Sequence, residues 1–170
     1  PGRDILRLME VTNYNFDRYQ CKSVLWDVSE ARFPERAVQF LFKHSFPKNM
    51  FNDFNSGSYL IGQVFPQRKV YIDGRTELYG TDFFNEYVAC VEGKKDVLEH
   101  VIERYNIKGF FLSNSVNDLH LGLLRYLFLS SQWKPVYFDE FAIVFLKNSQ
   151  ENTSLIKQYA IDLKRREAPK

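Results

Sequence analysis

Apolar residues recur at helical spacing in several stretches of the chain, with short apolar runs between them. The first clear stripe follows Phe33 and Pro34, and Pro34 suits the first position of a helix. Its members are Ala37, Val38, Leu41 and Phe42. We expect a further helix over residues 58–64, although its apolar pattern is shorter.

Three stripes in the second half of the chain predict three more helices. Thr81 is a suitable cap for the first, Gly93 suits its end, and Asn117 or Asp118 can cap the third. The stripes are Phe83, Phe84, Tyr87, Val88, Val91; then Val97, Leu98, Val101, Ile102, Tyr105; then Leu123, Leu124, Leu127, Phe128.

Short runs rich in β-branched and aromatic residues predict strands between these helices. They cover Met50–Asn52, residues 69–72 and Gly109–Ser113. Residues 135–146 alternate in polarity around Asp139 and Glu140, which favours a hairpin at a sheet edge. Helices alternating with strands predict an α/β fold with a mixed sheet of about five strands flanked by helices.

The patterning divides the chain into three parts around a single α/β domain at residues 33–150. Residues 1–32 form an N-terminal segment without a clean period, in which DILRLMEV favours a short helix. Residues 151–170 are expected to form a C-terminal helix that ends in a frayed tail. The apolar positions of that helix are Leu155, Ile156, Tyr159, Ala160 and Leu163.

Composition fits a globular domain, because 45% of the 170 residues are hydrophobic. The net charge of +2 is too small to indicate an electrostatic grip on nucleic acid, so no nucleic-acid partner is expected. No apolar run is long enough to span a bilayer. Cys90 fits a buried thiol, and Cys21 and Cys90 do not indicate a redox compartment.

No cofactor or metal site is expected from the motifs. The phosphate-binding glycine patterns are absent, and His44, His100 and His120 are far apart and fit roles on helix surfaces or caps. Asn152 begins a glycosylation-type triplet, N-T-S, that equally suits the cap of the last helix.

A first polar cluster follows the strand Met50–Asn52. Ligands of open α/β sheets bind at the carboxyl ends of strands, where helix amino termini offer free N–H groups. Capping and turn formation by Asp53, Asn55 and Ser56 is an equally good interpretation. The candidate binding residues here are Asn52, Asp53, Asn55, Gly57 and the neighbouring Tyr59.

A second polar cluster, DGRTELY, follows residues 69–72. Asp73 and Arg75 are able to hold one ligand between them. Tyr59, Tyr71 and Tyr79 flank the two clusters and can stack on a sugar or a lipid-linked headgroup. Alternatively, Arg75 pairs with Asp73 or Asp53 and braces the two loops. A hydrolase that uses Ser56, Asp73 or Glu77 with a distant histidine is a further alternative, but no spacing supports it and no catalytic residue is assigned.

The strings FPERAVQFL and FNDFNSGSYLIGQVFPQRKVYIDGRTELYG resemble the soluble region that follows the membrane bundle in bacterial multi-spanning proteins related to the C-type glycosyltransferases. The likeness covers residues 24–146 and is most specific at residues 51–80. A fainter likeness to oligosaccharyltransferase catalytic subunits lacks their tryptophans, and Asn55 stands where they have Asp. Ser58 also stands where the closer relatives often have Gly.

The resemblance implies a C-terminal domain on the extracytoplasmic, periplasmic face of the membrane. Its partners would be the upstream transmembrane region of the same protein and a lipid-linked sugar. Catalytic carboxylates and any metal belong to the membrane part in that superfamily, so this domain would be inactive alone. A purely structural or protein-interaction role for the two loops remains an alternative.

Overall fold

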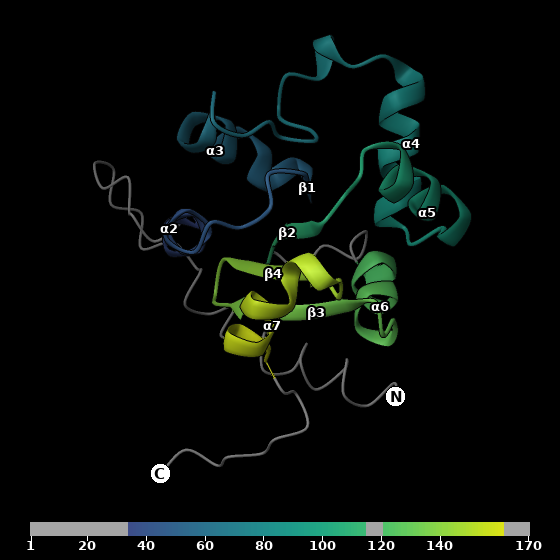
Figure 1. The fold of residues 1–170 in the computed structure, drawn as a ribbon. Helices are drawn as coiled ribbons and strands as arrows, with labels where there is room; N and C mark the ends of the chain where they lie inside the picture. Colours follow the sequence, from purple (N-terminus) through teal and green to yellow (C-terminus); the bar gives the residue numbers. More distant parts are fainter. Residues whose placement is uncertain (1–33, 115–120, 162–170) are drawn as a thin grey trace, which may run out of the picture.

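A four-stranded mixed sheet forms the centre of the fold in the computed structural model, which describes residues 34–114 and 121–161 (Figure 1). The strand order is β1-β2-β4-β3, with β1 parallel to β2 and the other pairs antiparallel. The strands are β1 (Met50–Asn52), β2 (Gly109–Ser113), β3 (Trp133–Phe138) and β4 (Ala142–Lys147). The predicted α/β class is therefore confirmed, with four strands in place of five.

Helices cover both faces of this sheet. They are α2 (Glu35–Lys43), α3 (Phe54–Val64), α4 (Thr81–Val91), α5 (Lys95–Arg104), α6 (Leu121–Leu129) and α7 (Thr153–Tyr159), with the 3₁₀ turns η3 (Thr76–Leu78) and η5 (Gln150–Asn152). The predicted helix near residue 5, the Asn117 or Asp118 cap, Leu163, Cys21 and the tail lie outside the described residues.

The side chains of the strands alternate between two hydrophobic clusters, as the period of two along a strand requires. Phe110, Leu112 and Phe145 belong to the cluster under α4, α5 and α6. Phe111 and Val144 belong to the cluster under α2, α3 and α7. The sheet is thus the middle layer of three.

The strand predicted at residues 69–72 is absent, and this prediction was wrong. The backbone there pairs with a side chain instead of a strand: Tyr71 N donates to Asn52 Oδ1 over 2.7 Å, and Asn52 Nδ2 donates to Ile72 O over 2.7 Å. The Asn52 amide thereby satisfies backbone groups that a ladder would otherwise use. The β propensity of this segment gave no sign that a side chain, rather than a neighbouring strand, would bond its backbone.

Smaller differences concern element ends and the hairpin. The helix α3 begins at Phe54, four residues before the predicted start, because Asp53 caps it. Gly80, rather than Thr81, is the residue before α4. The hairpin is confirmed, but only β3 lies at the edge, since β4 pairs with both β2 and β3. Cys90 is fully buried as predicted, and this burial raises the pKa of its thiol to about 12.

Candidate functional site

In the first predicted cluster, the side chains of Asn52, Asp53 and Ser56 point into the protein interior. Asp53 is fully buried and its carboxylate joins two elements. Oδ1 accepts a hydrogen bond from Ser56 N over 2.7 Å, which caps α3, and Oδ2 accepts one from Ser113 Oγ at the end of β2 over 2.6 Å. The capping interpretation of Asp53 is therefore confirmed, and its second oxygen fixes the start of α3 against the sheet.

Gly57 allows α3 to lie directly on the backbone of Ile72 and Asp73. A Cβ atom at this position would stand 2.0 Å from Ile72 O and 2.8 Å from Asp73 Cα. Any side chain would therefore push α3 away from residues 72 and 73. Ser58, one position along, accepts a hydrogen bond from Gly74 N over 3.1 Å and holds the same two segments together.

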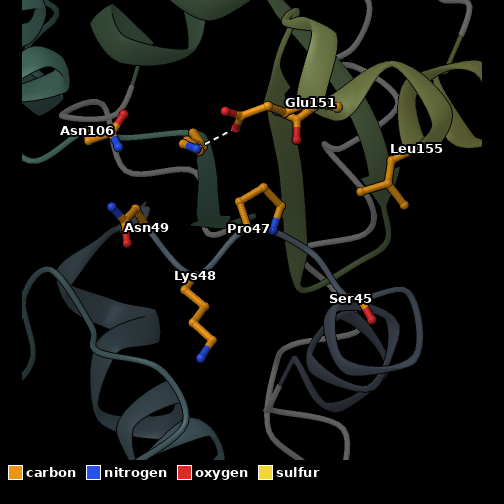
Figure 2. A pocket seen from close by; sticks show the side chains of 9 residues that line it. Ser45, Pro47, Lys48, Asn49, Asn106, Glu151 and Leu155 are labelled. Carbon is orange, nitrogen blue, oxygen red and sulfur yellow. Dashed lines mark hydrogen bonds and ion pairs between the residues drawn. The ribbon is translucent and has the colours of Figure 1, made fainter.

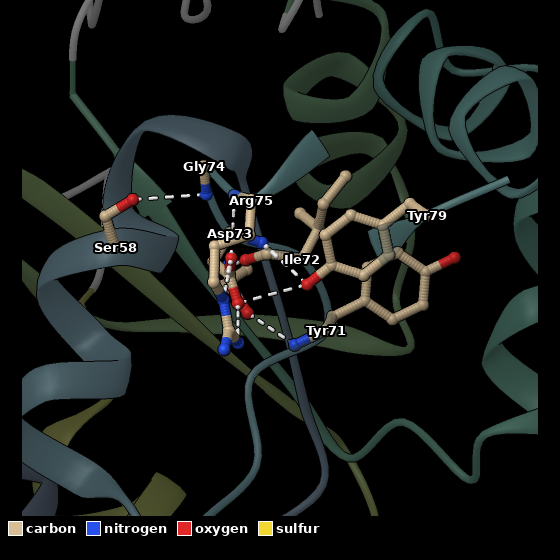
Figure 3. A network of polar contacts seen from close by, with 8 residues as sticks. Ser58, Tyr71, Ile72, Asp73, Gly74, Arg75 and Tyr79 are labelled. Atoms are coloured by element: carbon tan, nitrogen blue, oxygen red, sulfur yellow. Dashed lines mark hydrogen bonds and ion pairs between the residues drawn. The ribbon is translucent and has the colours of Figure 1, made fainter. Parts of the chain in front are cut away.

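The second cluster is organised around a buried carboxylate, as Figure 3 shows. Asp73 is 1% exposed and accepts hydrogen bonds from Arg75 Nε over 2.9 Å and Arg75 Nη2 over 2.7 Å. The Tyr79 hydroxyl donates to Asp73 Oδ2 over 3.1 Å. Asp73 therefore pairs with Arg75 as one alternative predicted, and Asp53 takes no part. The pair lies within the second cluster, so it braces that segment and does not join it to the first.

These contacts shift the titration of the network. The hydrogen bonds from Arg75 outweigh burial and lower the pKa of Asp73 from 3.8 to about 2. Burial, followed by the hydrogen bond to Asp73, raises the pKa of the Tyr79 hydroxyl. The carboxylate is therefore ionised and the phenol neutral at neutral pH, which fixes the loop in one arrangement.

The structure brings most of the predicted residues together but separates Tyr59 from Tyr79. Tyr79 stacks on Phe83 with ring centroids 5.1 Å apart and packs on the cluster under α4. Tyr59 packs on the cluster under α2, and burial followed by Glu35 raises its pKa. The two rings thus pack against opposite faces of the sheet and do not line one surface. Asn55 is exposed in the first turn of α3.

Three residues of this region carry contacts that the sequence did not indicate. Ser58 and Ser113 are described above, and the Tyr87 hydroxyl accepts a hydrogen bond from Phe54 N over 2.9 Å at the start of α3. Tyr87 stood in an apolar stripe, so only its ring was expected to matter. A buried tyrosine in a stripe is itself the available signal, because its hydroxyl needs a partner.

Within the described residues, those considered for hydrolysis do not form a nucleophile and base pair, and His120 lies outside that part of the chain. Ser56 is 2% exposed, and its hydroxyl donates to Asp53 O over 3.2 Å. His44 contacts the Tyr159 hydroxyl at 2.8 Å, and His100 lies exposed on α5. Glu77 is exposed in η3. No cluster of His, Cys, Asp or Glu suited to a metal ion occurs within residues 34–114 and 121–161.

A polar cleft lies at the opposite, amino ends of β1 and β2 (Figure 2). Its volume is about 370 Å³, and its lining includes Asn49, Asn106 and the ion pair between Lys108 and Glu151. Asn106 has a φ of 49°. None of these residues stood out in the sequence, because they come from separate segments that only the fold brings together.

No protein family, curated protein or solved structure matches this chain. Among the described helices, none has the length and apolar character needed to cross a membrane.

Proposed function

We propose that this chain is the extracytoplasmic accessory domain of a membrane-embedded, glycosyltransferase-like protein. Its second loop, residues 73–79, contacts the membrane-embedded part of that protein or the headgroup of a lipid-linked sugar. The domain supplies a shaped surface and no catalytic group of its own. The observation that carries the proposal is a loop whose buried Asp73 is hydrogen-bonded to Arg75 and Tyr79 and whose outer side chains are exposed.

The inner half of the site supports a structural role for the groups that first suggested ligand binding. Asn52, Asp53 and Asp73 are each at most 2% exposed, and described protein atoms occupy their polar groups. An incoming ligand would have to break these bonds, which is costly for buried polar groups. Contact with a partner therefore falls to the outer half of the loop.

The outer half offers one cation and one large apolar side chain, together with the exposed carboxylate of Glu77. The Arg75 side chain is 53% exposed although Asp73 holds two of its nitrogens, and Leu78 is 63% exposed. A guanidinium held in place loses little freedom when it meets a phosphate or carboxylate. An exposed leucine beside it suits contact with protein. Arg75 is suited to contact a phosphate of the lipid-linked headgroup. Leu78 is suited to contact the membrane-embedded part of the protein.

The coding sequence upstream of Pro1 tests the topology. We expect it to encode several apolar segments of about 20 residues, each long enough to cross a bilayer. An upstream region without such segments would refute the proposed parent protein.

Thiol labelling in native membranes tests the contact itself. A Leu78→Cys variant, made together with Cys21→Ser, should be protected from a membrane-impermeant thiol reagent in the full-length protein but not in this chain alone. Leu129→Cys is the matched control, because Leu129 is also exposed, at 54%, on α6. Cys90 adds little background, since it is buried. Equal labelling of positions 78 and 129 in membranes would count against the contact.

Assays of the full-length protein distinguish a loop that contacts a partner from a loop that only stabilises the domain. Leu78→Ser should impair assembly or activity while the domain stays folded, and Leu129→Ser should not. The double variant Asp73→Ala with Arg75→Ala should impair both, because it releases the loop. Unchanged activity and assembly of the double variant would remove the loop from the function.

A further inference from the structure

The charges of the protein are divided between two sides. Residues 35–72 contain five basic side chains and two acidic side chains, Glu35 and Asp53, and Asp53 is fully buried. Residues 73–104 contain eight acidic and four basic side chains. The first stretch includes α2 and α3, and the second includes α4 and α5, which lie on opposite sides of the molecule (Figure 1). The small net charge of the whole chain conceals this division.

Four of the five basic residues on the first side have no acidic partner among the described residues, and the fifth, Arg36, pairs with Glu140. No carboxylate in the described part of the chain forms an ion pair with Lys43, Lys48, Arg68 or Lys69. On the acidic side, by contrast, Arg75, Lys94, Lys95 and Arg104 all have carboxylate partners. Their positive charge is locally balanced, whereas that of Lys43, Lys48, Arg68 and Lys69 is open to an external anion.

Three of the unpaired cations gather around one crevice between α2 and α3. Lys48, Arg68 and Lys69 line this crevice together with apolar side chains such as Val64. Arg68 is held there by hydrogen bonds to two carbonyl oxygens, including Phe46 O at 2.7 Å. The positive charge therefore has a fixed place on the surface.

Exposed aromatic rings accompany these cations. Phe65, which directly follows α3, is 63% exposed, and Phe42 on α2 is 43% exposed. The Arg68 guanidinium lies 5.8 Å from the centre of the Phe42 ring. Large apolar side chains beside lysine and arginine suit the boundary between lipid headgroups and acyl chains, where the rings insert and the cations meet phosphates.

We propose that this basic face, formed by Phe42, Lys48, Phe65, Arg68 and Lys69, binds the surface of a membrane that contains anionic lipids. The acidic side of the molecule would be repelled by the same surface, so the domain would be held with α2 and α3 toward the lipid. Exposed phenylalanines favour a lipid surface over a nucleic acid, because phosphate contacts alone need no apolar insertion. Binding by the free chain does not depend on a membrane-embedded parent.

Vesicle cosedimentation tests the proposal with the chain as it exists. We expect binding to vesicles that contain phosphatidylglycerol, little binding to pure phosphatidylcholine vesicles, and a decline as salt is raised. Lys48→Gln with Lys69→Gln should weaken binding roughly tenfold or more. Phe65→Ala should weaken it several-fold at unchanged charge, which reports ring insertion.

Matched variants guard against a general charge effect. Lys94→Gln with Lys95→Gln removes the same charge from the acidic side, and Leu129→Ala shortens another exposed apolar side chain. Both should bind like the unmodified chain, and circular dichroism should show all variants folded. The proposal would be overturned if both lysine-pair variants lost equal vesicle affinity, or if binding did not depend on lipid charge. It would also be overturned if the chain did not bind anionic vesicles, or if it bound single-stranded RNA more tightly than the vesicles. If vesicle binding is found but no spans are encoded upstream, only the proposed parent protein fails.

Discussion

The two polar loops look alike in sequence but differ in what they present to solvent. The first, residues 52–57, proved to be the end of β1 and the start of α3, and its Asn52, Asp53 and Ser56 are each at most 2% exposed. In the second, residues 73–79, the Asp73 side chain is buried and Tyr79 packs on the core, while Arg75 and Leu78 remain exposed. The first loop joins elements, and the second is a braced surface. Short polar residues after a strand therefore do not by themselves indicate a ligand site.

The largest expected effect concerns the glycine where the two loops meet. Gly57→Ala should destabilise the protein by about 3 kcal/mol or more, because the new methyl group would collide with Ile72 O. Gly62→Ala is the control in the same helix, since a Cβ atom there would meet no other part of the protein within 4 Å. It should be neutral or stabilising by up to about 1 kcal/mol. Urea unfolding of both variants measures the difference, and equal stabilities would contradict the close contact.

Removing the Asn52 side chain, which joins β1 to residues 71 and 72, should have the next largest effect on stability. Asn52→Ala leaves Tyr71 N and Ile72 O without their partner, at an expected cost of about 2–3 kcal/mol in the free energy of unfolding. Asn85→Ala, on the exposed surface of α4, should change it by less than about 0.5 kcal/mol. Chemical denaturation at neutral pH compares the two. If Asn52→Ala lowered the free energy of unfolding as little as Asn85→Ala, the hydrogen bonds of Asn52 would not be what holds residues 71 and 72 to β1.

Acid should weaken the second loop. The pKa of Asp73 is about 2 when folded and ordinarily 3.8, so its contribution to stability is present above the ordinary pKa. That contribution is lost as the pH falls from about 4 to about 2 and is on the order of 1–2 kcal/mol, since Arg75 is half exposed. Unfolding measured across this range should show a shallower decline for Asp73→Asn than for the unmodified protein. Parallel declines would place the ionised carboxylate outside the stabilising network.

The smallest effect on stability is expected at the exposed edge of the second loop. Leu78→Ser should change the free energy of unfolding by less than about 0.5 kcal/mol, because Leu78 is 63% exposed. Thermal unfolding should therefore not distinguish it from the unmodified chain. A clear loss of stability would mean that the outer half of this loop is also structural.

Periodic apolar residues were sufficient to predict most of the architecture. The stripe containing Leu98 and Val101 became α5, and the alternation of Ile143 and Phe145 became β4. Both patterns depend only on neighbours in sequence and on one buried face. The helix α3 was only partly predicted, because the residues after Asp53 were interpreted as a loop although that side chain caps the helix.

The remaining features depend on contacts between distant residues. Composition identified residues 52–57 and 73–79 as special, but their inward orientation follows from Gly57 meeting Ile72 and from Asp53 reaching Ser113. The amino-end cleft combines residues near positions 49, 106 and 151. The separation of Tyr59 and Tyr79 follows from the sheet that lies between their clusters. No local pattern encodes such pairings.

The Asn52 amide has a consequence for how the protein behaves at high concentration. β1 is the outermost strand on its side of the sheet, and such strands can recruit a strand from another molecule and start aggregation. Asn52 ties Tyr71 and Ile72 beside this strand, and the ring of Tyr71 lies 4.5 Å from that of Phe51. At the far side of the sheet, Ile161 N donates to Pro135 O of β3 over 2.8 Å. Irregular chain thus lies along both margins of the sheet, and we expect it to hinder pairing with a strand of another molecule.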